Sequence, residues 1–260
     1  MSRFAKIFAA ARGRCTLIPY LTVGDPSLAA SRAVALALTE AGADILELGV
    51  PFSDPVADGP VIQAASQRAL AQGVRLADVL ELARAVRREA EVGLLLFSYY
   101  NPVLRYGLEA LARDAAAAGC DGVLITDLIP EEAAAYRTAM GAVGLDTVFL
   151  AAPTSTPERL AAIAAASSGF IYAVSRLGVT GAAVPPAEDA RTLVAALRLH
   201  TRLPIAVGFG LADARQIDDV AGYADGAVVG SALVRTLAAA PGREATAAKA
   251  FLQGLRHGNR

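Results

Sequence analysis

Eight short apolar runs, spread along the whole chain, limit what this sequence can fold into more than any other feature. Each run has the length and the branched or aromatic residues typical of a buried strand. Between the runs lie stretches rich in alanine and leucine that are long enough for helices. Strands and helices that alternate in this way predict parallel pairing of the strands. The runs span residues 16–21, 44–49, 93–97, 122–126, 146–151, 170–174, 204–208 and 226–230.

The same runs also bear on whether the predicted sheet closes. Polar residues do not alternate strictly along them, which indicates a parallel sheet that helices cover on both faces. An open, doubly wound sheet would meet this condition too. Eight units in 260 residues, with no GxGxxG motif after the first run, favour the closed (β/α)8 TIM barrel of the α/β class. Because no linker or second core divides the sequence, we expect one barrel domain over residues 1–260.

Two helices beyond the eightfold pattern are expected. The segment 1–14 is basic and free of acids, like a transit peptide, but its apolar part is too short for a secretion signal and a strand follows at once. We therefore expect an extra N-terminal helix that closes one end of the barrel. The interval between residues 49 and 92 has room for an inserted helix at 60–72, after the second strand. Further helix starts are indicated by Asp25-Pro26, Pro130-Glu131-Glu132 and Ser155-Thr156-Pro157-Glu158.

Charge and cysteine content narrow the class of partner and the compartment. The net charge is -1, and the arginines are scattered among acids, so we expect neither a nucleic-acid surface nor an anionic-membrane surface. No apolar run approaches the ~18 residues needed to span a bilayer. Cys15 and Cys120 lie far apart without CxxC spacing, which suits packing roles in a reducing compartment. We expect a soluble, cytoplasmic protein.

The rarest residues exclude several kinds of enzyme. The chain has two lysines, Lys6 and Lys249, and neither follows a predicted core strand, which argues against a Schiff base in the site. Its two histidines, His200 and His257, lie on late segments and predict no histidine-rich metal site. Acid and base chemistry therefore falls to carboxylates, tyrosines or backbone groups.

Glu47 is a carboxylate inside an apolar run, at the start of the stretch ELGVPFSDPVADGP. Side chains alternate along a strand, so Ile45, Glu47 and Gly49 share one face, and the two leucines between them share the other. If the leucines pack against helices, Glu47 points into the barrel mouth, where barrel enzymes place catalytic groups. We favour a catalytic role over a structural ion pair, because desolvation would raise the pKa of Glu47 toward a useful range.

Asp58 lies eleven residues later, in a loop that proline stiffens. An aspartate before Gly59-Pro60 is also ordinary geometry for capping a helix, and taken alone Asp58 would be interpreted as a cap. Its position in a long loop on the same face as Glu47 favours function, since two carboxylates in different environments can take different roles. Asp54, before Pro55, is interpreted as a turn residue.

Three glycine-containing segments follow the last three predicted strands, at 177–181, 208–210 and 230–231. Glycine allows backbone N–H groups to approach an anion closely, and a short helix from Ser231 would direct its positive end at that anion. Barrels bind phosphate at these loops. The alternative, that the glycines only form tight turns, explains one segment better than all three. We therefore predict a phosphate site.

Five motifs occur in order along the chain: PYLTVGDP (19–26), ELGVPFSDPVADGPVIQ (47–63), YYNP (99–102), SRLGVTG (175–181) and GFG (208–210). Together they resemble the tryptophan synthase alpha subunit family, with the likeness running from about residue 18 to residue 234. The resemblance implies a (β/α)8 lyase of tryptophan biosynthesis that cleaves indole-3-glycerol phosphate to indole and glyceraldehyde 3-phosphate. It also implies no cofactor in this chain, and a beta-subunit partner that carries pyridoxal phosphate and receives the indole.

The resemblance also implies roles for individual residues. Glu47 would act as general acid and base at indole C3 and at the glycerol hydroxyl, and Asp58 would steady the indole N–H as positive charge develops. Thr180, in a loop expected to be mobile, would orient Asp58 on closure. In the same loop, Leu177 stands where the family pattern has a small or polar residue, which bears on closure and leaves the chemistry intact. Tyr172, at the end of the sixth strand, would face the substrate, and the phosphate would sit on Gly181, Gly210, Gly230 and Ser231.

Three other functions remain as alternatives. A free-standing lyase that releases indole would have nearly the same sequence. A weakly catalytic subunit that mainly activates its partner is disfavoured, because Glu47 and Asp58 are both present. A phosphosugar isomerase on a similar barrel would share the phosphate site but would have no indole pocket.

Overall fold

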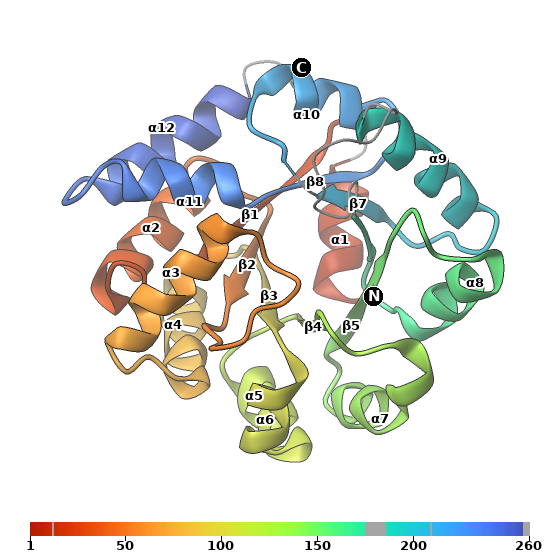
Figure 1. Cartoon of the computed structure of the whole chain (residues 1–260), viewed down its shortest axis with the longest axis horizontal. Coiled ribbons are helices and arrows are strands. Elements are labelled where there is room, and N and C mark those ends of the chain that lie inside the picture. The colour runs from red at the N-terminus through yellow and green to blue at the C-terminus, as the bar shows by residue number, and fades with distance from the viewer. Residues whose placement is uncertain (12, 175–185, 209, 257–260) are drawn as a thin grey trace.

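Eight parallel strands form a closed barrel in the computed structural model, which describes residues 1–11, 13–174, 186–208 and 210–256. The strands follow one another in chain order, and β8 pairs with β1 (Figure 1). Every strand ends within one residue of its predicted bounds, so the closed barrel is confirmed and the open sheet is wrong. The strands are β1 (Thr16–Thr22), β2 (Ile45–Gly49), β3 (Gly93–Ser98), β4 (Gly122–Ile125), β5 (Asp146–Ala151), β6 (Ile171–Val174), β7 (Ile205–Gly208) and β8 (Gly226–Val229).

Helices surround the barrel, because each strand is apolar on its outer face as well as on its inner one (Figure 1). None of the described helices combines the length and the apolarity that crossing a bilayer requires. The α-helices are α1 (Arg3–Ala10), α2 (Leu28–Glu40), α3 (Pro60–Ala71), α4 (Leu76–Glu89), α5 (Tyr100–Tyr106), α6 (Leu108–Ala117), α7 (Ala134–Ala142), α8 (Pro157–Ala166), α9 (Pro186–Arg198), α10 (Ala214–Ala221), α11 (Ser231–Ala238) and α12 (Glu244–Arg256).

The helix starts agree with the sequence in part. The inserted helix is confirmed as α3, and α8 begins at Pro157 with Thr156 as its cap. The start indicated by Asp25-Pro26 is displaced, because the Ser27 hydroxyl accepts the N–H of Ala30 and α2 begins after Ser27. Pro130 starts a one-turn 3₁₀ helix, η1 (Pro130–Glu132), and α7 follows it at Ala134.

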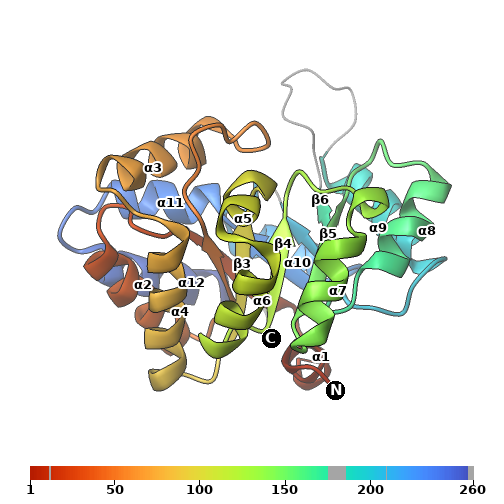
Figure 2. The same cartoon turned by 90° about the horizontal axis from the view of Figure 1, so that it is seen from below.

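The extra N-terminal helix, α1, closes the end of the barrel opposite α3, as predicted (Figure 2). Phe4 and Phe8 of α1 are buried among the inner side chains of the barrel, and both rings contact Phe170 at centroid distances of 5.6 Å. A Cβ atom at Gly122 or at Gly169 would come within 2.8 Å of the Phe4 ring. Glycine at these two positions therefore leaves room for α1 to fill the barrel.

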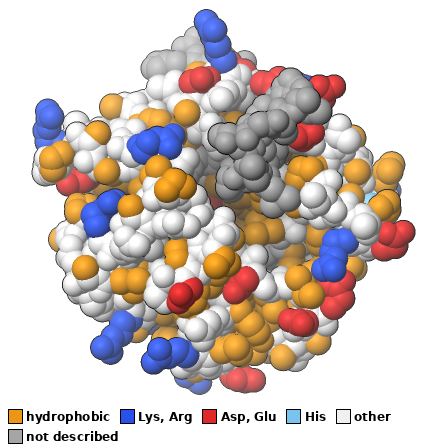
Figure 3. Space-filling view, in the orientation of Figure 1, with side chains coloured by type: hydrophobic (Ala, Val, Ile, Leu, Met, Phe, Trp, Pro, Cys, Tyr) orange, Lys and Arg blue, Asp and Glu red, His pale blue; other side chains and the backbone are white. Residues whose placement is uncertain are grey.

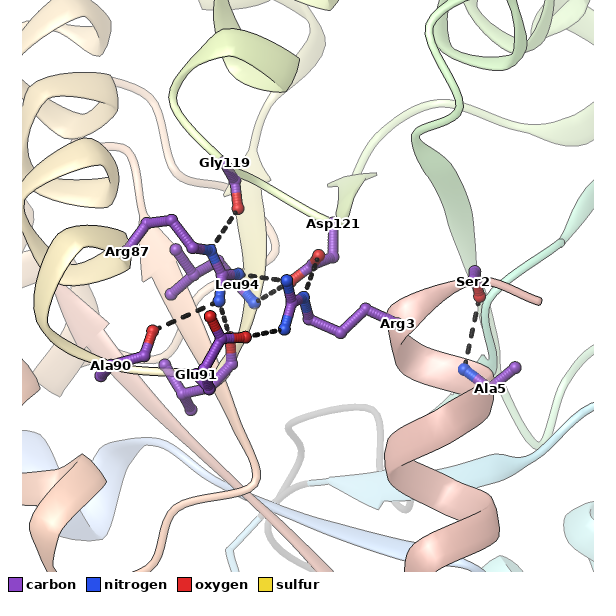
Figure 4. A network of polar contacts seen from close by, with 10 residues as sticks. Ser2, Arg3, Ala5, Arg87, Ala90, Glu91, Leu94, Gly119 and Asp121 are labelled. Atoms are coloured by element: carbon purple, nitrogen blue, oxygen red, sulfur yellow. Dashed lines mark hydrogen bonds and ion pairs between the residues drawn. The ribbon is translucent and has the colours of Figure 1, made fainter.

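Aspartates that precede strands tie the same end of the barrel together. Asp121, just before β4, accepts the N–H of Leu94 on β3 and forms ion pairs with Arg3 and Arg87 (Figure 4). Asp44, just before β2, likewise accepts the N–H of Leu17 on β1. Each carboxylate accepts a backbone N–H of the neighbouring strand and so holds the starts of the two strands together. The loops at the opposite end of the barrel do not take part in these contacts.

Candidate active site

Glu47 points into the barrel from β2. It lies opposite Tyr20 of β1 and Leu95 of β3 in the parallel register. Ile45, on the same face, is part of the inner core, whereas Leu46 and Leu48 are part of the outer core between strands and helices. The predicted alternation along β2 is therefore confirmed, and it places a carboxylate inside the barrel with 1% of its surface exposed.

No ion pair explains the burial of Glu47. Among the described residues no arginine or lysine contacts its carboxylate, and Oε1 has no hydrogen-bond partner there. Burial alone raises the pKa of Glu47 to about 8. The alternative of a structural ion pair is therefore wrong for the described part of the chain, and Glu47 is a carboxyl group that holds its proton at neutral pH.

Asp58 does not cap α3, so the capping alternative is also wrong. The N-cap residue of α3 is Gly59, and no side chain makes a cap hydrogen bond there. Instead, the hydroxyl of Tyr99 donates to Asp58 Oδ2 at 3.1 Å. Burial raises the pKa of Asp58 to about 6, and the hydrogen bond from Tyr99 opposes the rise. Asp58 is thus ionised at a pH at which Glu47 is still protonated.

The two carboxylates line one cavity of about 220 Å³ at the end of the barrel opposite α1. Figure 3 views the molecule from this side and shows a hollow near its centre, bordered by hydrophobic side chains. The walls combine apolar and aromatic surfaces with few polar groups, as expected of a pocket for a small ligand with an apolar part. The lining residues are Tyr20, Glu47, Asp58, Gly59, Pro60, Val61, Ile62, Phe97, Tyr172, Gly210, Val228, Gly230, Ser231 and Arg235.

Two tyrosines reach into the cavity because glycines on neighbouring strands leave room for them. A Cβ atom at Gly49 would collide with the hydroxyl of Tyr20, and one at Gly208 would collide with the hydroxyl of Tyr172. The sequence predicts Tyr172 at the end of the sixth strand, whereas it is the second residue of β6. Its hydroxyl nevertheless extends toward the end of the strand. Tyr172 lines the cavity, and its contact with a substrate stays a prediction.

The glycine end of the cavity contains most of the residues predicted to bind phosphate. Gly210, Gly230 and Ser231 line the cavity, and α11 begins at Ser231 as predicted. A Cβ atom at Gly210 would meet no other protein atom within 4 Å, so this backbone faces open space. Arg235, one turn further along α11, lines the same end. The predictions for Leu177, Thr180 and Gly181 fall outside the described residues.

Sequence reasoning missed several residues of the cavity. Tyr20 and Phe97 form one wall, with ring centroids 5.3 Å apart. Tyr99 contacts Asp58, although its motif, YYNP, was quoted only for its resemblance. Arg235 could have been found from its spacing of four residues after Ser231, which places both on one side of a helix.

Among the described residues that line the cavity there is no lysine, histidine or cysteine. Lys6 lies on α1 at the opposite end of the barrel, and Lys249 on α12 forms an ion pair with Glu40. Across the residues that the structure describes, no three histidine, cysteine, aspartate or glutamate side chains gather as a group that could hold a metal ion. The described groups that can exchange protons with a ligand are carboxyl and phenol groups.

Comparison with known proteins identifies relatives of this chain. The family model for the tryptophan synthase alpha chain matches residues 6–257. The tryptophan synthase alpha chain of Solibacter usitatus is 51% identical over 239 residues, which cover 91% of this chain and 90% of the relative. The alpha chain of Geobacter sulfurreducens is 48% identical over 262 residues, which cover 98% of each chain.

Solved structures agree with these relatives. A chain of tryptophan synthase from M. tuberculosis, in an aminoacrylate-bound form, superimposes with a TM-score of 0.91 at 42% identity, and the match covers 100% of both chains. Tryptophan synthase subunit alpha from Legionella pneumophila gives a TM-score of 0.90 at 34% identity, with 99% of this chain and 98% of the other covered.

Proposed function

This chain belongs to the tryptophan synthase alpha chain family, and we propose here how its residues carry out the reaction of that family. It is a lyase of tryptophan biosynthesis that cleaves indole-3-glycerol phosphate to indole and glyceraldehyde 3-phosphate. The observation that carries the assignment of roles is that two carboxylates with raised pKa values line one cavity whose other end is glycine and serine backbone.

Glu47 acts as the general acid and then as the general base. Protonated at neutral pH, it donates its proton to indole C3, which moves positive charge into the ring. The resulting carboxylate takes the proton of the glycerol hydroxyl as the bond between indole C3 and the glycerol carbon breaks. The bonding electrons return to the ring, the hydroxyl carbon becomes the aldehyde, and Glu47 regains its proton for the next cycle.

Asp58 stabilises the ring while it carries positive charge. Its carboxylate is ionised above about pH 6 and faces the same cavity as Glu47. The indole N–H becomes more acidic when C3 is protonated, so a hydrogen bond to Asp58 strengthens in the transition state. The protonated ring serves as the electron sink, and the carbon–carbon cleavage then requires no Schiff base from a lysine of this chain.

The substrate phosphate binds at the glycine end of the cavity. Backbone N–H groups near Gly210 and Gly230, the Ser231 hydroxyl and the N-terminus of α11 provide donors and positive partial charge for an anion. We include Thr180 and Gly181, which lie outside the described residues, on the family pattern alone. The apolar walls and the rings of Tyr20, Phe97 and Tyr172 hold the indole.

The partner of this chain is the tryptophan synthase beta subunit, which receives the indole. We propose that it docks around the segments that follow β2, β3 and β4, where exposed apolar side chains occur: Val56 in the loop after β2, Leu104 on α5 and Ile129 after β4. Pyridoxal phosphate then belongs to the beta subunit, which is consistent with the positions of Lys6 and Lys249 away from the cavity. We further propose that the complex works in the cytoplasm.

The deciding experiment measures indole release from indole-3-glycerol phosphate by this chain, with and without a beta subunit. Slow release alone and fast release in the complex are expected. Full activity in the isolated chain would favour the free-standing lyase, and negligible activity in the complex would favour a subunit that only activates its partner. The phosphosugar isomerase would be supported if the chain failed to bind an indole phosphate analogue.

A further inference from the structure

Tyr99 lies between the active-site loop and the wall of the barrel. It follows β3, serves as the N-cap residue of α5, and is only 2% exposed. Its ring lies against Phe52 at a centroid distance of 5.1 Å and an interplanar angle of 32°. Phe52 lies three residues after the end of β2, in the loop that carries Asp58, so the Tyr99 ring contacts this loop near its start.

The Tyr99 hydroxyl holds the other end of the same loop with two hydrogen bonds. Its oxygen accepts the backbone N–H of Ala57 at 3.0 Å, and the hydroxyl lies 3.1 Å from Asp58 Oδ2. An amide N–H can only donate, so the single phenol proton is directed at the carboxylate. Oδ1 has no hydrogen bond within the described residues, which leaves that oxygen for a ligand.

A second contact involves the backbone of the loop and not the Asp58 carboxylate. Gln63 of α3 donates from Nε2 to the carbonyl oxygen of Asp58 at 2.8 Å. Between Phe52 and Asp58 the loop residues Ser53, Asp54 and Val56 are exposed, so little else orients the Asp58 side chain. The loop position therefore depends on both Gln63 and Tyr99, whereas the direction of the carboxylate depends on Tyr99 among the described residues.

We propose that Tyr99 is a positioning residue, which turns the Asp58 carboxylate so that Oδ1 faces the indole N–H. This inference rests on the role of Asp58 proposed above. The hydrogen bond also favours the ionised carboxylate, because the phenol proton stabilises negative charge on Oδ2. The other titratable groups near Asp58 cannot replace the hydrogen bond from Tyr99. Tyr20 of β1, Glu47 of β2 and Tyr172 of β6 are neutral at neutral pH. Arg235 of α11 lines the cavity without contacting Asp58.

Tyr99→Phe tests the proposal, because it removes one oxygen atom and keeps the ring that contacts Phe52. We expect kcat/KM to fall about tenfold, since a hydrogen bond to a charged group is lost. We also expect the acid limb of the kcat/KM profile to move to higher pH, because Asp58 loses the donor that lowered its pKa. A thermal melt checks that the variant is folded.

The matched control is Phe52→Leu, which loosens the ring contact and keeps both hydrogen bonds of the Tyr99 hydroxyl. Its acid limb should stay where it is in the unaltered protein, even if activity falls. A Tyr99→Phe profile with an unmoved acid limb, or with less than about twofold loss of kcat/KM, would overturn the proposal.

A third variant, Asp58→Asn, separates this inference from the proposed function. If Asp58→Asn is nearly inactive while Tyr99→Phe behaves like the unaltered enzyme, the role of Asp58 stands and the role of Tyr99 fails. If Asp58→Asn retains full activity, both fail together. The inference is supported only when Asp58→Asn is impaired and Tyr99→Phe shows the shifted acid limb.

Discussion

At the scale of single residues, burial distinguishes the two carboxylates of the cavity. Glu47 is 1% exposed, and this burial raises its pKa to about 8. Asp58 is half-buried and receives a hydrogen bond, so its pKa rises only to about 6. Between these values one group is an acid and the other is an anion, which is the combination that protonating an indole ring requires.

The activity of the enzyme should therefore have a bell-shaped pH dependence. Ionisation of Asp58 should raise kcat/KM through about pH 6, and loss of the Glu47 proton should lower it through about pH 8. The two values belong to an interacting pair, so the limbs report the pair and not each residue alone. A profile measured with indole release checks this, and a rate that still rises above pH 9 would contradict it.

Glu47→Gln keeps the shape of the side chain and removes the transferable proton. We expect turnover to fall on the order of 10²-fold or more, with folding retained. The folded pKa of Glu47 lies above its ordinary value of 4.5, so its protonated form stabilises the folded state at low pH and this contribution is lost as pH rises through about 8. Urea unfolding at pH 5 and pH 8 should show a smaller pH effect in the variant, and near-normal turnover would refute the catalytic role.

At the scale of elements, the two ends of the barrel have different tasks. Asp44 and Asp121, which precede β2 and β4, accept backbone N–H groups of neighbouring strands, and α1 fills that end with phenylalanine rings. At the other end, the strands lead into the loops that line the cavity. Changes at the first end should alter stability, and changes at the second should alter binding and turnover.

Asp121→Asn tests the first end. The Asp121 side chain is 12% exposed, pairs with Arg3 and Arg87 and accepts the N–H of Leu94, so an amide removes the carboxylate that pairs with Arg87 and leaves Arg3 with Glu91 as its partner. We expect a cost of about 1 to 3 kcal/mol in unfolding free energy, seen as a lower Tm with kcat unchanged. Asp225→Asn is the matched control, because its ion pair with Arg198 is more exposed and should cost less. An equal loss in both would contradict this.

Gly230→Ala tests the second end. A Cβ atom at Gly230 would lie 3.7 Å from Tyr20 and 3.8 Å from Ile62, in ordinary contact, and the backbone there does not have a positive φ. The variant should fold normally but raise the KM for substrate more than it lowers kcat, because a methyl group narrows the phosphate end.

Gly210→Ala provides a comparison with Gly230→Ala. At Gly210 φ is +78°, so a side chain there adds backbone strain as well as narrowing the phosphate end. That variant should lose stability in addition to affinity. If the unaltered enzyme bound substrate and its dephosphorylated analogue equally well, the phosphate site itself would be refuted.

At the scale of the whole molecule, we propose that residues 1–260 form one domain that unfolds in a single transition. The barrel is closed by the pairing of β1 with β8, so the two halves of the chain share one sheet. The helix at one chain end also contacts the start of the barrel, since Arg256 of α12 forms an ion pair with Asp44. Two separate calorimetric transitions would contradict a single domain.

Binding of the beta subunit and of substrate should be coupled. The loop that carries Asp58 also carries the exposed Val56, so a partner docked there would bias the position of the Asp58 carboxylate. By linkage, a substrate analogue should tighten association with the beta subunit by the same factor that the subunit tightens the analogue, worth ~1 to 3 kcal/mol. Titration calorimetry with and without the beta subunit measures it, and an unchanged analogue affinity would contradict coupling.

Much of the fold and part of the cavity could be predicted from the sequence. Strand positions follow from local runs of apolar residues, and the alternation along β2 decides that Glu47 faces inward. Gly210, Gly230 and Ser231 were found because each follows a strand, and the ends of parallel strands meet on one face. These features depend on residues that are close in sequence, because local backbone geometry decides which way their side chains point and where a strand ends.

Only the tertiary structure decided how Asp58 is held. Tyr99 lies 41 positions away in the chain, and no local pattern predicts that its hydroxyl would reach Oδ2. Capping, the local alternative for Asp58, was wrong because the loop places Gly59 at the start of α3 and turns the carboxylate toward β3. The pKa of Glu47 likewise depends on closure of the whole barrel, because side chains from strands far apart in sequence bury it. Which side chains surround Glu47 is decided only when the strands pair, and no local pattern in the sequence specifies it.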